Sequence, residues 1–397
     1  MDSTAQPQRH ATAMAESATL LVSFELSEGC WVLTLRQPSS VKLSRLSMPA
    51  RDTEKLLCLL TAQRRQAERR CERAVRVISI YEAGRDGFWL HRWLLAHEVE
   101  SHVVDPASIL GSRRRRKAKT DRIDGEKLLR SLAAWLGGEG DRCSMVRPPS
   151  VAQEDERRLS RERGELVKER TRLSNRINGL LANQGIGGFT PLQKGARQML
   201  DELRTGDGHA LLPQLRMGIV RMLERLVLLG QQIKAVEAER DARLKAVPAD
   251  TGAVGQRAAT PEQETGRLLV RLRSIGAEFA SVLSLECFYR QFNNRRQLAS
   301  FAGLAPTPWS SGSVEREQGI SKAGCRRLRT SMIELAWSWT RHQPGSGLTQ
   351  WFHRKVAGQG KRMRRIAVVA LARKLLVALW RYVRDGVVPQ GAVLKAD

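Results

Sequence analysis

The sequence predicts a mixed α/β domain, followed by a long charged helical segment and a mostly helical C-terminal region. Three observations support this division. Strand-like and helix-like patterns alternate over residues 19–104, leucines recur at heptad spacing in the middle of the chain, and residues 361–384 form a long amphipathic helical pattern. With 397 residues, 42% of them hydrophobic, the chain is long enough for two or three domains with sizeable cores.

The N-terminal pattern predicts three strands and a helix, and then a strand, a helix and a strand. The corresponding residues are 19–26, 30–36, 41–47, about 51–70, 74–82, 88–97 and 99–105. A further helix is predicted from Asp121 to about Trp135. Strands that alternate with helices in this way are typical of a layered α/β domain, which we place at residues 19–150.

The middle of the chain predicts a pair of long amphipathic helices. Leucines recur every seven residues in the first segment, at Leu159, Leu166, Leu173 and Leu180. Apolar residues alternate at spacings of three and four in the second, at Leu212, Leu215, Ile219, Met222, Leu226, Leu229, Ile233 and Val236. Such stripes need a partner helix. We expect a coiled coil over residues 151–246 that also brings protomers together; the alternative is a helical spacer packed on its own chain.

The remaining segments are assigned by composition. Residues 1–18 are polar, lack a signal-peptide apolar run, and are predicted to be a disordered leader. Residues 247–263 have the composition of a linker. Residues 264–397 are predicted to form a mostly helical C-terminal domain.

The charge of the chain points to a polyanionic partner. Lys and Arg number 67 against 41 Asp and Glu, which gives a formal net charge of +26. DNA or RNA is favoured over an anionic membrane, and the alternative is a protein from a generally basic proteome. No run approaches the ~20 apolar residues of a membrane helix, so no membrane partner is expected. The six cysteines form no C-x-x-C pair, which argues against zinc sites and disulfides and fits the reducing cytoplasm.

Four carboxylates stand out in this basic chain: Glu25, Glu82, Asp121 and Asp124. Asp121 and Asp124 are three residues apart on a predicted helix, so their side chains share a face. The two glutamates lie on predicted strands, which hold side chains rigidly. Carboxylate oxygens suit Mg²⁺ or Mn²⁺, and two such ions can act on a phosphate backbone. Alternatively, the two aspartates only stabilise the N-terminus of their helix.

Two basic runs are candidate nucleic-acid contacts. The first leads directly into the two aspartates and contains Arg113, Arg114, Arg115, Arg116, Lys117 and Lys119; a solvated loop is the alternative. The second contains Lys322, Arg326, Arg327 and Arg329. At helical spacing, Arg326 and Arg329 are expected to share a face with Lys322 and to contact phosphates. Trp337, Trp339, Trp351 and Trp380 are interpreted mainly as core residues.

The chain resembles the DEDD transposases of bacterial insertion sequences, the family that includes Piv- and MooV-type DNA invertases. Four passages carry the resemblance: Glu25 in VSFEL, Glu82 in YEAGRDGFWL, the run KTDRID that contains Asp121 and Asp124, and GLAPTPWSSGSVEREQGISKAGCRRLR at 303–329. The resemblance implies an α/β RNase H-like (RuvC-like) N-terminal domain, whose four acids bind metal, and a C-terminal transposase domain. The family normally has Asp where this chain has Glu25.

The resemblance also implies a mechanism and partners. It places a nucleophilic serine at Ser311, before Gly312, that forms a covalent phosphoserine with DNA. It implies a bridge RNA that guides the recombinase to donor and target DNA, and a homo-oligomer, dimer or tetramer, whose site combines different protomers. From the residues alone, Ser311 is an ordinary turn residue. Two alternatives remain open: a metal-only nuclease of the resolvase type, and a degenerate copy that binds nucleic acid without cutting it.

Overall fold

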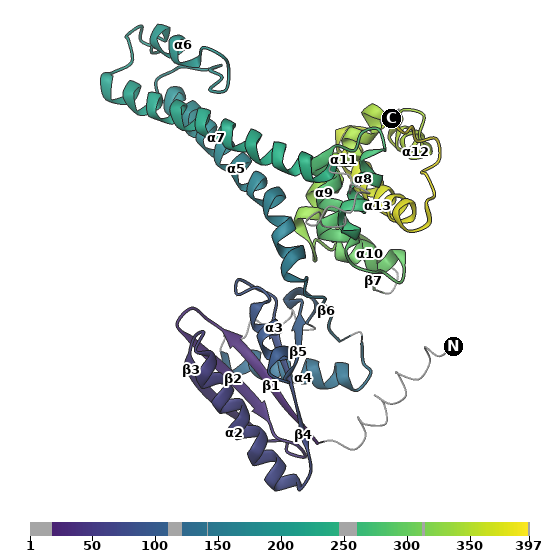
Figure 1. The fold of residues 1–397 in the computed structure, drawn as a ribbon. Helices are drawn as coiled ribbons and strands as arrows, with labels where there is room; N and C mark the ends of the chain where they lie inside the picture. Colours follow the sequence, from purple (N-terminus) through teal and green to yellow (C-terminus); the bar gives the residue numbers. More distant parts are fainter. Residues whose placement is uncertain (1–17, 110–120, 141, 246–259, 312–313, 396–397) are drawn as a thin grey trace, which may run out of the picture. The chain divides into compact units, whose positions relative to one another are not determined.

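The chain forms two compact units, Met1–Pro149 and Ser150–Asp397. The computed structural model describes residues 18–109, 121–140, 142–245, 260–311 and 314–395 (Figure 1). The predicted leader, the basic run at 111–120 and most of the predicted linker therefore lie outside the described residues. The division of the chain into five segments stays a prediction.

The first unit is built on a mixed sheet with strand order β3-β2-β1-β4-β5-β6. Its elements are β1 (Ala18–Leu26), β2 (Cys30–Arg36), β3 (Leu43–Pro49), α2 (Thr53–Cys71), β4 (Val75–Glu82), α3 (Trp89–Ala96), β5 (Glu100–Val104), η1 (Pro106–Ser108), α4 (Asp121–Leu136) and β6 (Met145–Val146). Strands β1, β4 and β5 are parallel, whereas β2, β3 and β6 pair antiparallel with their neighbours. The predicted elements are all present, and β6 was not predicted.

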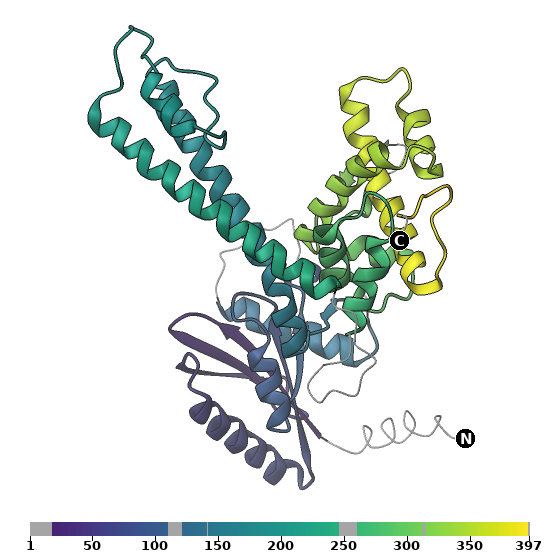
Figure 2. The ribbon, with the colours of Figure 1, turned by 45° about the horizontal axis from the view of Figure 1, so that its top comes forward.

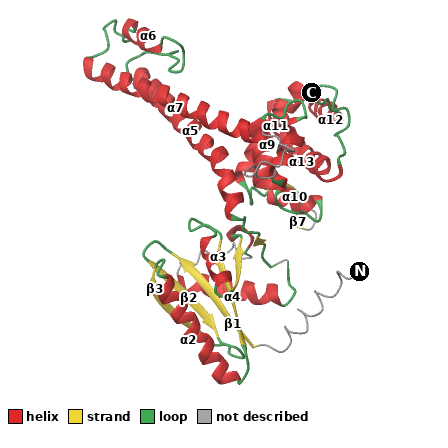
Figure 3. Ribbon diagram, in the orientation of Figure 1, coloured by secondary structure: helices red, strands yellow, loops and turns green. Residues whose placement is uncertain are grey.

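Helices cover both faces of this sheet (Figure 3). Alternate residues of β1 point to opposite faces, so Leu20, Val22 and Phe24 pack in one core with buried leucines of α2 and α3. Leu21 packs in the other core, with Ile80 of β4 and with α4. The result is a three-layer α/β/α unit, and its order and strand directions are consistent with an RNase H-like fold.

The second unit is mainly helical. Its elements are α5 (Val151–Ala182), α6 (Ala196–Glu202), α7 (Pro213–Lys245), α8 (Pro261–Val270), α9 (Ala277–Leu283), the π-helical turn η2 (Ser284–Phe288), α10 (Arg295–Phe301), β7 (Pro306–Ser311), β8 (Val314–Ile320), α11 (Arg326–His342), α12 (Gly347–Val356) and α13 (Lys361–Asp385). The core of the C-terminal helices contains Leu335, Trp339, Leu371 and Leu375. The predicted helix at 361–384 is confirmed.

Helices α5 and α7 run side by side as an antiparallel hairpin (Figures 1 and 2). Leu173, Ile177 and Leu181 of α5 share a core with Ile219 and Leu226 of α7. The predicted stripes thus find their partners within one chain. That the hairpin also brings protomers together stays a prediction.

One prediction about an apolar residue was wrong, and one pair of strands was not predicted. Leu212 was placed in the stripe of the second helix, but α7 begins at Pro213 and Leu212 is 74% exposed. The hairpin of β7 and β8 was not predicted, because Pro306 and Pro308 and the polar residues of both strands are poor strand formers. Backbone pairing between the two strands forms this hairpin despite those propensities.

A network of charged side chains ties the base of the hairpin to the C-terminal helices. Glu278 of α9 accepts hydrogen bonds from Arg240 Nη1 at 2.6 Å, from Arg327 Nη2 at 3.2 Å, and from Ser160 Oγ at 3.3 Å. Arg161 donates two hydrogen bonds to the buried Glu286. Burial raises the pKa of Glu286, but the bonds and charge of Arg161 outweigh it and leave the pKa below its usual value.

The hairpin pairing predicts unequal effects of two equivalent substitutions on α7. Leu226 is 3% exposed and Leu228 is 54% exposed. Leu226→Ala should lower the free energy of unfolding by about 2–5 kcal/mol, because it removes buried methyl groups and leaves a cavity. Leu228→Ala should change it by less than about 0.5 kcal/mol. Urea denaturation followed by far-UV circular dichroism measures both, and equal losses would contradict the assigned faces.

Candidate active site

Two of the predicted acids lie next to each other at one end of the sheet. β1 and β4 are parallel neighbours whose last paired residues are Phe24 and Tyr81, so Glu25 and Glu82 follow at adjacent positions. Glu25 lies four residues after Leu21 on β1, so the two belong to the same face of the sheet. Glu82 lies two residues after Ile80 on β4 and likewise shares its face. Leu21 and Ile80 both pack against α4. Both glutamates therefore belong to the face of the sheet that α4 covers.

The first turns of α4 are held directly over Glu25. Ser23 Oγ, two residues before Glu25 on the same face, donates a hydrogen bond of 3.0 Å to the carbonyl oxygen of Gly125. A Cβ atom at Gly125 would lie 2.8 Å from Glu25 Oε1 and closer still to Thr34 Oγ1. A side chain at position 125 would have to displace the side chains of Thr34 and Glu25, so glycine favours this close approach of α4 to the strand that carries Glu25.

Asp124 is half-buried, and its Oδ1 forms an ion pair with Lys127 Nζ at 2.9 Å. Asp121 is the first residue of α4, one turn before Asp124. Its side chain lies outside the described part of the structure. The fold thus brings Glu25, Glu82 and Asp124 to one end of the sheet, with the backbone of Asp121 on the same helix.

The donor set fits a hard divalent cation in its chemistry. The acids supply carboxylate oxygens, the donor type that Mg²⁺ and Mn²⁺ prefer. Among the described residues, no group of three or more His, Cys, Asp and Glu lies close enough to hold a metal ion.

Ser311 lies on the hairpin of the second unit. It is the last residue of β7 and pairs with Val314 of β8, while Ser310 pairs with Glu315. The backbone at Ser311 is therefore extended. The structure describes no side-chain position for either serine, so the role of Ser311 stays a prediction.

The second basic run divides into two groups. Lys322 and Arg326 are exposed, whereas Arg327 donates hydrogen bonds to Ser160 Oγ and Glu278 and so binds within its own unit. Arg329 donates to the backbone oxygen of Lys322 at 2.8 Å. The prediction that Arg326 and Arg329 share a helical face with Lys322 was wrong, because α11 begins only at Arg326. The residues Arg113, Arg114, Arg115, Arg116, Lys117 and Lys119 lie outside the described residues.

The four tryptophans differ in burial. Trp339 is fully buried and Trp380 nearly so, as predicted. Trp337 is 38% exposed and lies under the guanidinium of Arg364, which contradicts its assignment to the core. Trp351 is half-buried, and Lys374 Nζ lies 4.8 Å from its ring centroid.

Comparison with known proteins extends these observations. A family model described as a transposase, for the DEDD transposases of IS110, matches residues 50–184. A model described as "Transposase IS116/IS110/IS902 family" matches residues 266–351. The chain is 49% identical to "Putative transposase y4rJ" of Sinorhizobium fredii over 98% of both chains. The chain belongs to the IS110 family of insertion-sequence transposases.

The other relatives are more distant. The transposase for insertion sequence element IS1111A of Coxiella burnetii is 30% identical over 65% of this chain and 67% of its own. The transposase for IS1328 of Yersinia enterocolitica is 26% identical over 68% of this chain and 73% of its own. The chain is thus a transposase, an enzyme that acts on DNA. No helix among its described residues is long and apolar enough to pass through a bilayer.

The two family matches cover most of the predicted site. The first includes Glu82, Asp121 and Asp124, and the second includes Ser311. Glu25 lies before the first match. Sequence reasoning missed Ser23, which anchors α4. It also missed the glycine within the run DRIDG, which directly follows Asp124 and would have been the signal of a close approach.

The packing of Gly125 leads to a matched pair of substitutions. Gly125→Ala should push α4 away from Glu25 and weaken Mn²⁺ binding by about 10–100-fold, as loss of supporting contacts around metal ligands does. A Cβ at Gly230 of α7 meets nothing within 4 Å, so Gly230→Ala is the control and should leave Mn²⁺ binding unchanged. Isothermal titration calorimetry measures both. Equal affinities in the two variants would rule out Gly125 as part of a metal site.

Proposed function

We propose that this transposase cuts and rejoins DNA strands through a covalent phosphoserine at Ser311, assisted by metal-binding carboxylates. The observation that carries the proposal is the register of β1 and β4. It brings Glu25 and Glu82 side by side, on the face where Gly125 packs α4 with its two aspartates. Family membership supports the reaction class, since the chain is related to insertion-sequence transposases over its whole length.

The proposed reaction is a pair of transesterifications. Ser311 Oγ forms an ester bond to the scissile phosphorus, the phosphodiester bond breaks, and the released strand leaves with a free hydroxyl that takes up the proton. A hydroxyl of the recipient strand then attacks the phosphoserine, forms the new phosphodiester, and returns the proton to Ser311. Each step exchanges one phosphate ester for another, so no high-energy cofactor is consumed.

Glu25, Glu82, Asp121 and Asp124 are the proposed ligands of Mg²⁺ or Mn²⁺. A bound divalent ion would supply Lewis-acid polarisation of the phosphoryl oxygens and lower the pKa of a coordinated hydroxyl. The chain itself contributes the rigid strand positions of the two glutamates and the fixed start of α4. Lys127 holds the Asp124 carboxylate in place through its ion pair.

The proposal also includes a guide RNA and a homo-oligomer. A net charge of +26 supports a protein that holds several nucleic-acid strands at once. Base pairing by the RNA would select donor and target DNA. The protein itself would then contact mainly the nucleic-acid backbone and recognise the shape of the helix. The exposed Lys322 and Arg326, and the basic run at 111–120, are the proposed phosphate contacts.

The nucleophile is tested by a matched pair of neighbouring serines. Ser311→Ala should abolish strand exchange and the covalent protein–DNA adduct, because no other group replaces the attacking oxygen. Ser310→Ala should retain both within about tenfold, and Asp121→Ala should abolish exchange while leaving RNA binding near normal. Gel separation of denatured protein–DNA adducts reads out the covalent step. Exchange at the wild-type rate in Ser311→Ala would disprove the serine mechanism, and cleavage without any adduct would favour hydrolysis by water.

Glu25 gives a second test, because the family normally has Asp at this position. Glu25→Asp shortens the side chain by about 1.5 Å and keeps the carboxylate, so strand exchange should be retained or raised. Glu25→Gln keeps the length but removes the charge, and exchange should fall by about 100-fold or more. Glu28→Asp, in the turn between β1 and β2, is the control. Full exchange by Glu25→Gln would remove Glu25 from the proposed ligand set.

A further inference from the structure

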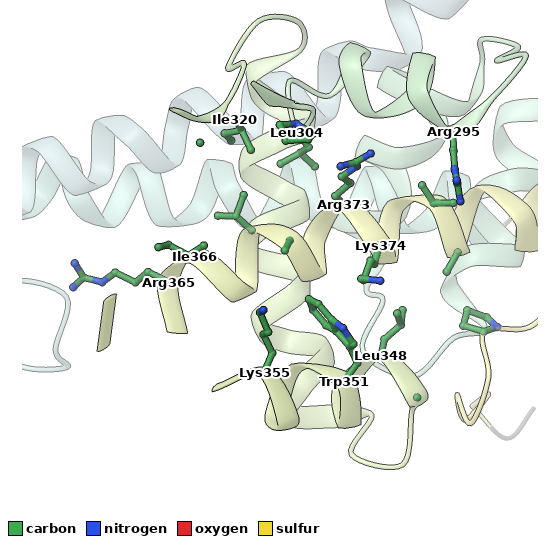
Figure 4. A pocket seen from close by; sticks show the side chains of 18 of the residues that line it. Arg295, Leu304, Ile320, Leu348, Trp351, Lys355, Arg365, Ile366, Arg373 and Lys374 are labelled. Carbon is green, nitrogen blue, oxygen red and sulfur yellow. The ribbon is translucent and has the colours of Figure 1, made fainter. Parts of the chain in front are cut away.

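An open groove of about 1910 Å³ runs along helix α13 in the second unit (Figure 4). Of the 28 described residues that line it, ten are Lys or Arg and none is Asp or Glu. The surrounding elements are α10, α12, the base of the β7–β8 hairpin, and the segment after α13. Such a concentration of one charge attracts a polyanion and repels cations.

The helix α13 has two contrasting faces. Leu371, Leu375 and Leu379 are fully buried in the core of the unit. The groove side carries cations over most of the length of the helix, from Arg362 through Arg373 to Arg381. Arg362 and Arg381 are nineteen residues apart, which corresponds to about 28 Å along the helix axis. The spacing suits an extended chain of phosphates better than a single small anion.

The groove also presents apolar surface between the cations. Trp351 of α12 points into it, and Lys374 lies over the tryptophan ring (Figure 4). Ile366 is 51% exposed and Val387 is 57% exposed, and both line the groove. Exposed aromatic and aliphatic side chains flanked by Arg and Lys are the combination that binds unpaired bases and their phosphates together. A duplex would leave this apolar surface unused, because its base faces are stacked inside.

The composition of the groove favours DNA over RNA. A protein distinguishes RNA by hydrogen bonds to its 2′-hydroxyl groups, which require polar side chains or exposed backbone groups. Lys, Arg and Trp can only donate to such a hydroxyl, and Thr307 and Gln390 are the only side chains with an acceptor oxygen among the described lining residues. The remaining side chains offer charge and apolar contact, which a deoxyribose strand satisfies.

The groove is continuous with the hairpin that carries Ser311. Pro306 and Thr307 of β7 line the groove together with Gly319 and Ile320 of β8. Ser311 is four residues beyond Thr307 on the same strand, about 13 Å away along an extended backbone. We propose that this groove binds a single DNA strand, one that is unpaired when the duplex opens, and leads it toward the serine hairpin. That the strand is led toward a nucleophilic serine rests on the proposed function, whereas binding of the strand in the groove does not.

Two neighbouring arginines of α13 provide the test in the full-length protein. Arg365 lines the groove, whereas Arg364 lies over Trp337 and does not line it. Arg365→Glu should weaken binding of a fluorescein-labelled single DNA strand by about tenfold or more, and should lower the salt slope of log K by about 0.7 for each lost phosphate contact. Arg364→Glu makes the same change in net charge and should have less than about a threefold effect. Fluorescence anisotropy over a salt series measures both.

A second measurement reports on the bases. Binding of an unlabelled DNA strand should quench tryptophan fluorescence through stacking on Trp351. The quenching should be lost in Trp351→Leu and kept in Trp337→Leu, a control that is exposed but outside the groove. Retained quenching in Trp351→Leu would overturn the stacking assignment.

The remaining outcomes separate this proposal from its rivals and from the proposed function. Equal losses in Arg365→Glu and Arg364→Glu would overturn the groove as a binding site. A loss that is larger for RNA or for duplex DNA of the same sequence would overturn the assignment to a single DNA strand. A loss of oligomer in Arg365→Glu, with unchanged strand binding, would show that a second copy covers the groove. Ser311→Ala protein should bind the single strand normally, so a failed serine mechanism leaves this result intact.

Discussion

The close packing of α4 on the central strands is the constraint on which the proposed site depends. Gly125 allows the helix backbone to approach the Glu25 carboxylate and the Thr34 hydroxyl, and the hydrogen bond from Ser23 fixes the helix at that point. A larger residue at position 125 would separate α4 from the strand that carries Glu25. One small residue thus decides whether acids from strands and helix can act together.

The cations of the second unit are used differently between its helices and on its surface. Arg240 and Arg327 form ion pairs with Glu278, and Arg161 forms an ion pair with Glu286, so these cations connect helices. Such partly buried pairs favour the contacts between these helices, since a carboxylate left unpaired there would be costly. The α13 cations that line the groove have no acidic partner among the described lining residues and remain available to a polyanion. The same residue type therefore serves packing in one place and binding in another.

Each of the two units contributes features that the proposed transposase reaction needs. The first unit presents carboxylates at the end of a rigid sheet, where phosphate chemistry needs hard oxygen donors. The second unit offers an extended hairpin with Ser311 and, at the base of that hairpin, a basic groove with an apolar floor. Positive surface alone would hold any nucleic acid, whereas the half-buried Trp351 and its exposed aliphatic neighbours favour unpaired bases.

The sequence by itself determined the elements of the first unit and the identities of the candidate acids. Alternating and heptad patterns locate strands and long helices because burial of one face repeats with the period of the element. The pairing of α5 with α7 was an open choice, since an apolar stripe shows that a partner is needed but not which one. The heptad pattern also included Leu212, because periodicity does not show where a helix begins.

Only the tertiary structure decided which residues meet. The adjacency of Glu25 and Glu82 follows from strand order, and the approach of α4 follows from a glycine whose neighbours are distant in sequence. The internal role of Arg327 and the groove beside α13 likewise arise from side chains on several elements. A sequence pattern records local periodicity and charge, whereas a site is made by contacts between segments far apart in the chain. That is the physical reason why the residue types were predictable and their partners were not.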